Sequence, residues 1–225
     1  MNLDKPEEIK KSNKSFLMAL HSCSDTLGVA IIDSRRPRES LSSSTFPIGR
    51  SLSNNLLNCV EEVLPSSFWP QLGRLSVAIG PGGFTGTRLT VVMARTLAQQ
   101  LDLYLDGVSS FNLMAPRLAT SINPIDRDKP FWIVKDLPRR GIIGGKYQIK
   151  KNLKFKNSEQ IVEIEKPHLL SPQINLECSI QASDNVAKDV VQLIEYSLLA
   201  YKVGEQSEWK QVLPIYPTSP VKNIH

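Results

Sequence analysis

Residues 78–88 read Ala78-Ile-Gly-Pro-Gly-Gly-Phe-Thr-Gly-Thr-Arg88, and this stretch decides the fold. It follows an apolar run at residues 75–79 that predicts a buried strand, and it precedes a long segment with helical spacing of apolar side chains. Backbone N–H groups in such a loop point outward at a helix N-terminus, which suits an anion. The candidate anion residues are Gly80, Gly82, Gly83, Thr85, Gly86 and Arg88. The alternative is a tight turn that only packs the helix on the strand.

Two common phosphate-binding loops do not fit this stretch. In a Walker A alignment ending at Gly86, Pro81 takes the place of the first glycine and Thr87 that of the lysine. The G-x-G-x-x-G spacing of dinucleotide-binding folds is also absent. The loop therefore predicts neither a P-loop nucleotidase nor a dinucleotide-binding enzyme.

The elements around the loop follow a recognisable order. Three strands come first, then a helix with apolar residues from Leu52 to Leu64, then the strand, a helix from about Thr87 to Leu101, and a short strand. The three opening strands are expected at 16–20, 27–32 and 41–46, and the last one at 107–109. This order predicts an α/β fold, with a mixed sheet flanked by helices as in ribonuclease-H-like domains.

The second half of the chain is less regular. Strands are predicted at 131–134 and 145–149, and an amphipathic helix at 186–201 with Ser183 or Asp184 as its N-cap. Prolines at 116, 124 and 130 indicate a boundary between subdomains. The predicted organisation is a flexible tail at 1–15, an N-terminal subdomain at 16–115 and a smaller C-terminal subdomain at 116–225.

The segment Gly80-Pro-Gly-Gly-Phe-Thr-Gly-Thr-Arg88 resembles the G-P-G-S-F-T-G-[LV]-R signature of the TsaB family, with glycine in place of serine at Gly83. Residues 16–33 resemble the opening hairpin of that family, residues 51–64 its first helix, and residues 214–216 its P-x-Y segment. The resemblance implies the ASKHA fold, with two subdomains. It also implies a non-catalytic scaffold that binds and enables the TsaD transferase in N6-threonylcarbamoyladenosine modification of tRNA.

Several positions depart from the family pattern. The opening strand of the family ends in D-T-S, where this chain has His21, Ser22 and Cys23. The second-subdomain motif D-A-R-x-x-E-V-Y is only partly matched, by Asp136, Arg139 and Tyr147, and the arginine of a C-terminal Y-x-R is missing after Tyr216. In active ASKHA enzymes the aspartate of D-T-S helps to hold metal and phosphate, so the resemblance implies that His21 in its place argues against nucleotide hydrolysis.

The histidines also favour a non-catalytic role. His21, His168 and His225 are the only histidines, and no two are four residues apart, so the H-x-x-x-H metal pair of TsaD-like enzymes is missing. Neither a G-x-S-x-G elbow nor a C-x-x-C pair is present. We expect no catalytic residue, no metal and no cofactor.

The helix after the loop is apolar on two sides. Leu89, Val92, Met93 and Leu97 form one face, and Val91, Ala94, Ala98 and Leu101 form another. A partner or the second subdomain must cover the extra face. In the family, the first two helices pair with those of TsaD or of a second TsaB. The candidate interface is Leu52, Leu56, Val60, Val63, Leu89, Val91, Ala94, Arg95, Ala98 and Leu101.

Charge leaves a further interpretation open. The segment from Lys135 to Lys156 contains eight basic residues and one acidic residue, Asp136. This excess of positive charge predicts either an RNA-binding surface or a solvated strand edge. The alternatives to a scaffold are therefore an ASKHA-type kinase or ATPase and a basic RNA-binding module. The expected partners are a TsaD-like transferase, a TsaE-like ATPase and, in a homodimer, a second copy, with tRNA bound only through the complex. No apolar run suggests a signal or a membrane span, so a cytoplasmic location is expected.

Overall fold

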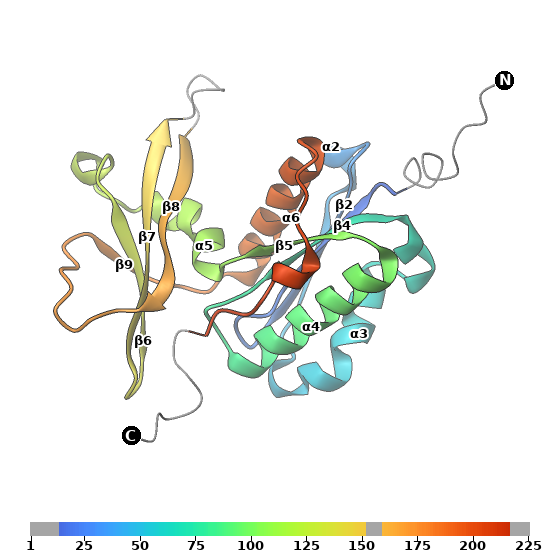
Figure 1. The fold of residues 1–225 in the computed structure, drawn as a ribbon, viewed down its shortest axis with the longest axis horizontal. Helices are drawn as coiled ribbons and strands as arrows, with labels where there is room; N and C mark the ends of the chain where they lie inside the picture. The colour runs from blue at the N-terminus through green and yellow to red at the C-terminus, as the bar shows by residue number, and fades with distance from the viewer. Residues whose placement is uncertain (1–13, 152–158, 217–225) are drawn as a thin grey trace. The chain divides into compact units, whose positions relative to one another are not determined.

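The computed structural model describes residues 14–151 and 159–216, which form two units. The first unit contains residues up to Val108 together with Asn185–Pro214, and the second contains Ser109–Asp184. The sequence had placed the boundary at 115/116 and all later residues in the second subdomain. The structure differs because residues 185–214 return to the first unit (Figure 1).

The first unit is built on a five-stranded sheet with the order β3-β2-β1-β4-β5. β1 pairs with β4 and β4 with β5 in parallel, whereas β1–β2 and β2–β3 are antiparallel. This mixed sheet is the one predicted. Its strands are β1 (Phe16–His21), β2 (Leu27–Asp33), β3 (Ser42–Phe46), β4 (Leu72–Ala78) and β5 (Tyr104–Val108).

Helices cover both faces of this sheet. α3 (Leu52–Val63) and α4 (Phe84–Leu101) pack on one face, where Leu27, Val29 and Leu75 belong to the same core as the buried side chains of both helices. α6 (Val186–Lys202) lies on the other face, because Gly28, which alternates with Leu27 and Val29, faces Val186. The short helices of this unit are α2 (Pro37–Ser40), η1 (Gly49–Ser51), η2 (Ser66–Gln71) and η4 (Trp209–Gln211).

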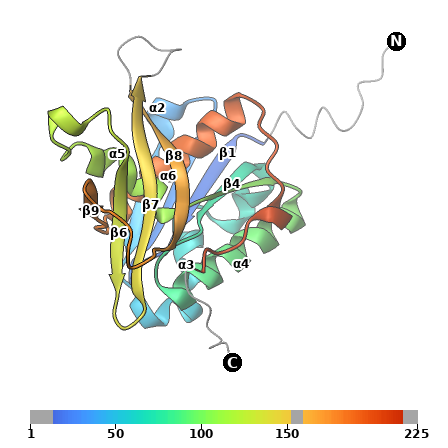
Figure 2. The same cartoon turned by 60° about the vertical axis from the view of Figure 1, so that its left-hand side comes forward.

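The second unit repeats part of this topology. Its sheet has the order β8-β7-β6-β9, in which β6 pairs with β9 in parallel and the other pairs are antiparallel. The order matches β3-β2-β1-β4, a repeat that the sequence does not reveal. Figure 2 shows its three long strands side by side. The elements are α5 (Ser110–Ala119), η3 (Pro124–Asp126), β6 (Phe131–Leu137), β7 (Gly141–Lys151), β8 (Glu159–Leu169) and β9 (Ser179–Gln181).

Some predictions for the second half are corrected by the structure. Pro116, expected to open a loop, lies inside α5, which packs its apolar side chains against β7 and β8. The N-cap of α6 is Asn185, whose side chain accepts a hydrogen bond from the Lys188 N–H, and not Ser183 or Asp184. The predicted strands are confirmed and are longer than expected. No helix among the described residues is both long and apolar enough to cross a membrane.

A buried arginine fastens the segment after α6 to the sheet. Arg74 on β4 is 1% exposed, and its Nε and Nη2 atoms donate to the two carboxylate oxygens of Asp106 on β5, both at 2.6 Å. Nη1 donates to the Glu205 carbonyl at 2.7 Å, and Nη2 to the Ser207 hydroxyl at 2.9 Å. We call residues 203–212 the strap. The Leu105 N–H donates to the Ser207 carbonyl, so the strap pairs with the outer edge of β5 and protects it.

Replacing Arg74 with methionine is expected to lower the free energy of unfolding by about 3–5 kcal/mol, because Asp106 keeps a partly buried charge without its partner. The double variant Arg74→Met/Asp106→Asn removes that charge and is expected to recover part of the loss. Urea unfolding followed by circular dichroism measures both. A single variant as stable as the wild type would contradict this account of the strap.

The β2–β3 connection holds an ion pair with a defined pH dependence. Hydrogen bonds from the Arg35 guanidinium lower the pKa of Asp33 from 3.8 to about 2, although burial of the carboxyl raises it. The two charged contacts measure 2.9 and 3.0 Å. Asp33 is therefore charged in the folded protein down to a lower pH than in the unfolded chain.

The stability that Asp33 contributes is fully present above about pH 4 and is lost as pH falls from about 4 to about 2. Arg35 is 59% exposed, so solvent screens the pair and the contribution is on the order of 1 kcal/mol. Unfolding of wild type and Asp33→Asn between pH 2 and 7 should show a difference at neutral pH that vanishes near pH 2. A stability difference that stays the same from pH 7 to pH 2 would show that ionisation of Asp33 is not the cause of the difference.

Candidate functional site

The glycine-rich loop joins β4 to α4 and packs closely against the turn between β1 and β2. The helix begins at Phe84, three residues earlier than predicted, so Thr85 and Gly86 lie in its first turn. A Cβ on Gly82 would lie 2.2 Å from the Cys23 carbonyl oxygen, and one on Gly86 would lie 2.9 Å from the Ser22 carbonyl oxygen. These two glycines are needed because the backbone of the turn occupies the space of a side chain.

Two polar contacts join the loop and the start of α4 to the β1–β2 turn. The Gly83 N–H donates to the Cys23 carbonyl at 2.8 Å, and the Ser22 and Thr90 hydroxyls are 2.5 Å apart. Gly80 has a φ of 98°, which favours glycine. The Gly83 N–H, one of the donors that an anion would need, is therefore used to bind the β1–β2 turn.

One position of the loop tolerates a side chain. A Cβ on Gly83 would come no closer than 3.8 Å to the Cys23 carbonyl oxygen, which is an ordinary contact. Gly83 is also the position at which the resembling signature has serine. The packing explains why the departure at this position leaves the junction intact.

Gly82→Ala is expected to lower the free energy of unfolding by about 1–3 kcal/mol, because the added methyl group must displace the backbone at Cys23. Gly83→Ala adds the same group at the next residue and is expected to change stability by less than about 0.5 kcal/mol. Thermal or urea unfolding of the pair tests the packing role. Equal effects of the two substitutions would argue against it.

The remaining candidate anion residues lie outside this junction. The Arg88 guanidinium stacks over the Phe84 ring, with its central carbon 3.5 Å from the ring centroid. Thr85 is exposed and lines an open cleft of about 290 Å³ with Gly83, Gly86 and residues of the β1–β2 turn. The structure thus brings the loop residues together, but it orients Arg88 along its own helix.

The positions that depart from the family pattern are also defined. His21 is 1% exposed at the end of β1, and its Nδ1 lies 3.5 Å from the Cys23 N–H. His168 lies on β8 in the second unit, and His225 is outside the described residues. No group of three or more His, Cys, Asp or Glu side chains suited to a metal ion occurs within residues 14–151 and 159–216. Burial raises the pKa of the Cys59 thiol, as expected of a core cysteine.

The partial second-subdomain motif does not form a ligand site of the expected kind. Tyr147 is fully buried, and its hydroxyl donates to Glu163 at 3.1 Å, as does the Ser109 hydroxyl that caps α5. Arg139 is exposed in the β6–β7 turn with a φ of 64°, and Asp136 is exposed on β6. Tyr147 therefore belongs to the core of the second unit, whereas Asp136 and Arg139 lie on its surface. Residues 217 and 218, which follow Tyr216, lie outside the described residues.

The predicted partner face needs correction. Six of its ten residues are less than 9% exposed and belong to the core of the first unit: Leu52, Leu56, Val60, Val91, Ala94 and Ala98. Val63, Leu89, Arg95 and Leu101 are partly exposed. The sheet, α3 and η4 all pack against α4, so the unit itself buries the side of that helix that carries Val91, Ala94 and Ala98. The side that carries Leu89, Val92, Met93 and Leu97 stays partly exposed. A charge at Val91 or Ala94 would unfold the unit and would not test partner binding.

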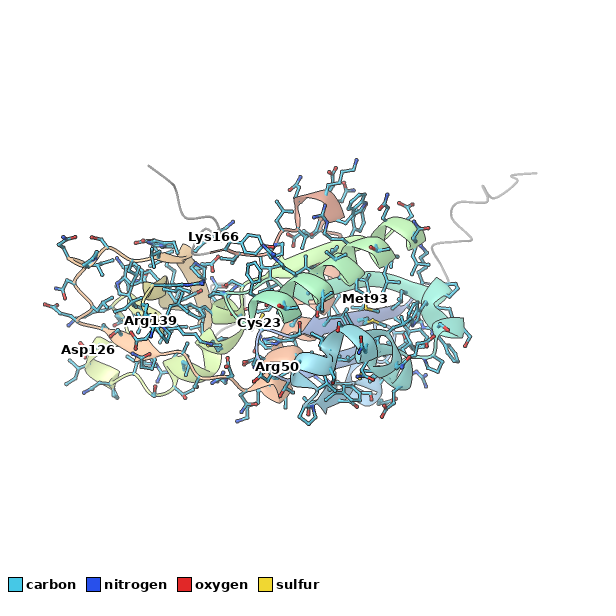
Figure 3. All side chains as sticks on the ribbon, turned by 90° about the horizontal axis from the view of Figure 1, so that it is seen from below. Cys23, Arg50, Met93, Asp126, Arg139 and Lys166 are labelled. Atoms are coloured by element: carbon cyan, nitrogen blue, oxygen red, sulfur yellow. The ribbon has the colours of Figure 1, made fainter. Side chains whose placement is uncertain are left out.

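The surface that α3 and α4 present to solvent is a different set of residues. Leu57 is 51% exposed and Val92 is 61% exposed, and Leu89 and Met93 are partly buried beside them on α4. Figure 3 shows the two helices side by side on the face seen from below, with Met93 labelled. Leu57 was missed in the sequence because it was grouped with the helical core pattern, and Val92 was placed on the apolar face but left out of the interface. We call Leu57, Leu89, Val92 and Met93 the outer face.

Two lysines of the basic segment lie beside acidic residues of the second unit. Lys146 pairs with Glu165 in register and lies 3.6 Å from its carboxylate, and Lys135 lies 3.7 Å from Asp184. The ring of Trp132, the aromatic residue beside Lys146, is only 6% exposed. Charge pairing therefore accounts for Lys135 and Lys146, whereas Arg139 and Arg140 are exposed in the β6–β7 turn, and residues 152–158 lie outside the described part of the chain.

A sequence model of the TsaD family, described as tRNA N6-adenosine threonylcarbamoyltransferase, matches residues 48–167, more than half of the chain. The chain belongs to this family. It is 29% identical over 139 residues to the Bacillus subtilis tRNA threonylcarbamoyladenosine biosynthesis protein TsaB, covering 61% of this chain and 57% of that protein. Among the family's members it is TsaB/YeaZ-like.

Solved structures support the fold. YeaZ from Pseudomonas aeruginosa is 21% identical with a TM-score of 0.59, covering 90% of this chain and 99% of that structure. A second Pseudomonas aeruginosa structure, described as an uncharacterized protein with similarity to peptidase YeaZ, is 20% identical with a TM-score of 0.62, covering 91% and 100%. The TsaB/YeaZ-like chain thus has the predicted ASKHA-like fold.

Proposed function

We propose that this TsaB/YeaZ-like chain is a non-catalytic subunit that binds a TsaD-like transferase and enables threonylcarbamoyladenosine modification of tRNA. The outer face carries the proposal. Two of its apolar side chains, Leu57 and Val92, are more than half exposed, although they sit on helices that bury Leu52, Leu56, Val60, Val91, Ala94 and Ala98 in the core. When a partner removes exposed apolar groups from water, the free energy falls, so these groups favour association.

The chemistry of the site favours a supporting role. The β1–β2 turn and the glycine-rich loop bind each other through the Gly83 N–H and the close approach at Gly82. His21 stands where active ASKHA enzymes carry an aspartate that helps to hold metal and phosphate. These features support a loop that fixes the position of α4 relative to β1, and with it the outer face, and they give no support to a phosphate site.

The other two functions have fewer observations behind them. An ASKHA-type kinase or ATPase requires nucleotide binding beside this junction, where the Gly83 N–H already donates to the Cys23 carbonyl. A separate RNA-binding module requires a basic surface, but Lys135 and Lys146 lie beside acidic partners. We propose that tRNA and a TsaE-like ATPase meet the chain through the complex, and that a homodimer would use the same outer face.

Leu57→Glu and Val92→Glu are expected to weaken binding of the TsaD-like transferase from the same organism at least tenfold, about 1.4 kcal/mol, because a charge would be buried at the interface. Both variants should fold, since both positions are exposed. Size-exclusion chromatography with light scattering measures complex formation, and a threonylcarbamoyl-transfer assay with and without the chain measures its effect on the enzyme.

Leu199→Glu is the matched control. Leu199 is 58% exposed on α6, on the opposite face of the sheet, and its replacement should leave binding unchanged. Wild-type binding by both outer-face variants would overturn the proposed interface. The proposed function itself fails if the wild-type chain forms no complex with the transferase and binds ATP or tRNA alone.

A further inference from the structure

The open cleft at the start of α3 and α4 has no role in the packing of the first unit. Its walls come from the β1–β2 turn, η1 and the first turns of both helices. Its volume of about 290 Å³ is at the lower limit for small-molecule sites, which suits a single large side chain better than a cofactor. Arg50, labelled in Figure 3, lies in the segment that leads into α3.

The cleft continues the outer face. Ser53 lines it on α3, and Leu57 follows one helical turn later on the same side. Leu89 lines it on α4, and Val92 and Met93 are the next residues on that side. A partner that covers the outer face therefore reaches the mouth of the cleft.

The walls of the cleft favour an aromatic occupant. Phe84 lines it and its ring is 48% exposed, while the Arg88 guanidinium covers that ring at 3.5 Å. Leu27, Ile48 and Leu52 add apolar surface. An incoming aromatic ring can stack against the exposed part of Phe84 and bury this surface, which is how interface anchors contribute most of their affinity.

The polar groups of the cleft favour a neutral polar tip on that ring. Arg50 and Asp25 both line the cleft, and their opposite charges leave no net charge for an ionic anchor. The hydroxyls of Thr26, Ser53 and Thr85 offer both donors and acceptors. A phenol hydroxyl can donate and accept at once, whereas a carboxylate or an ammonium group gains no net attraction from a pair of opposite charges.

We infer that the cleft is an anchor site for a tyrosine side chain of the partner that docks on the outer face. This inference rests on the proposed function and extends it, because it names where the interface is anchored and by which chemistry. The tyrosine ring lies against Phe84, and its hydroxyl reaches the polar rim formed by Arg50, Asp25 and the hydroxyl side chains.

Two variants test the anchor. Ser53→Trp places a large side chain at the mouth of the cleft, and Phe84→Ala removes the stacking wall. Each is expected to weaken binding of the TsaD-like transferase at least tenfold by isothermal titration calorimetry, with a midpoint of thermal unfolding near that of the wild type. Glu195→Trp on α6, on the opposite face of the sheet, is the control and should bind as the wild type does.

The outcomes separate the anchor from the proposed function. If both cleft variants bind as tightly as the wild type while Leu57→Glu does not bind, the outer face is an interface and the anchor inference is wrong. If the two cleft variants lose binding, a scan of the exposed tyrosines of the transferase, each changed to alanine and to phenylalanine, identifies the occupant. The anchor tyrosine should show a loss with alanine and a smaller loss with phenylalanine, and no tyrosine with a loss would overturn the assignment.

Discussion

The close approach of two backbone segments governs the first unit. The turn after β1 and the loop after β4 come so near each other at Cys23 and Gly82 that no side chain fits between them. This contact sets where α4 begins and how it lies on the sheet. It also determines which side chains α4 turns toward solvent, and so connects a sequence motif to a surface far along the helix.

The same contact shows why a glycine-rich loop is a weak indicator of chemistry. Glycines between a strand and a helix serve phosphate binding when the N–H groups face an open site. Here the Gly83 N–H donates a hydrogen bond to the Cys23 carbonyl, and Gly82 allows the two backbone segments to approach because it has no side chain. The spacing of the motif is compatible with both uses. Only the position of the β1–β2 turn, which is distant in sequence, distinguishes them.

The sequence predicted local elements well and their burial poorly. The strands and helices of the first unit follow from apolar periodicity, but the two-sided pattern of α4 could not show which of its two apolar sides the unit buries. β8 was missed because Pro167 and several Glu and Lys residues, which have low strand propensity, outweigh its short alternation, and Glu165 has its partner, Lys146, on β7. α6 was predicted as a helix, yet nothing local shows that Val186 and Val190 pack against Gly28. The cleft likewise joins residues from three separate segments, 24–27, 48–53 and 83–89.

The interrupted path of the chain through the first unit has a consequence for its biosynthesis. Residues 109–184 are synthesised before α6, which covers one face of the sheet, and before the strap. Arg74 therefore has no contact with Glu205 and Ser207 until these residues leave the ribosome. A nascent chain therefore carries a sheet with one bare face and a buried-type arginine still in water. The second unit can fold during this interval, whereas the first closes only after residues 185–214 have been made. Chaperone contact during synthesis should accordingly concentrate on the first half of the polypeptide.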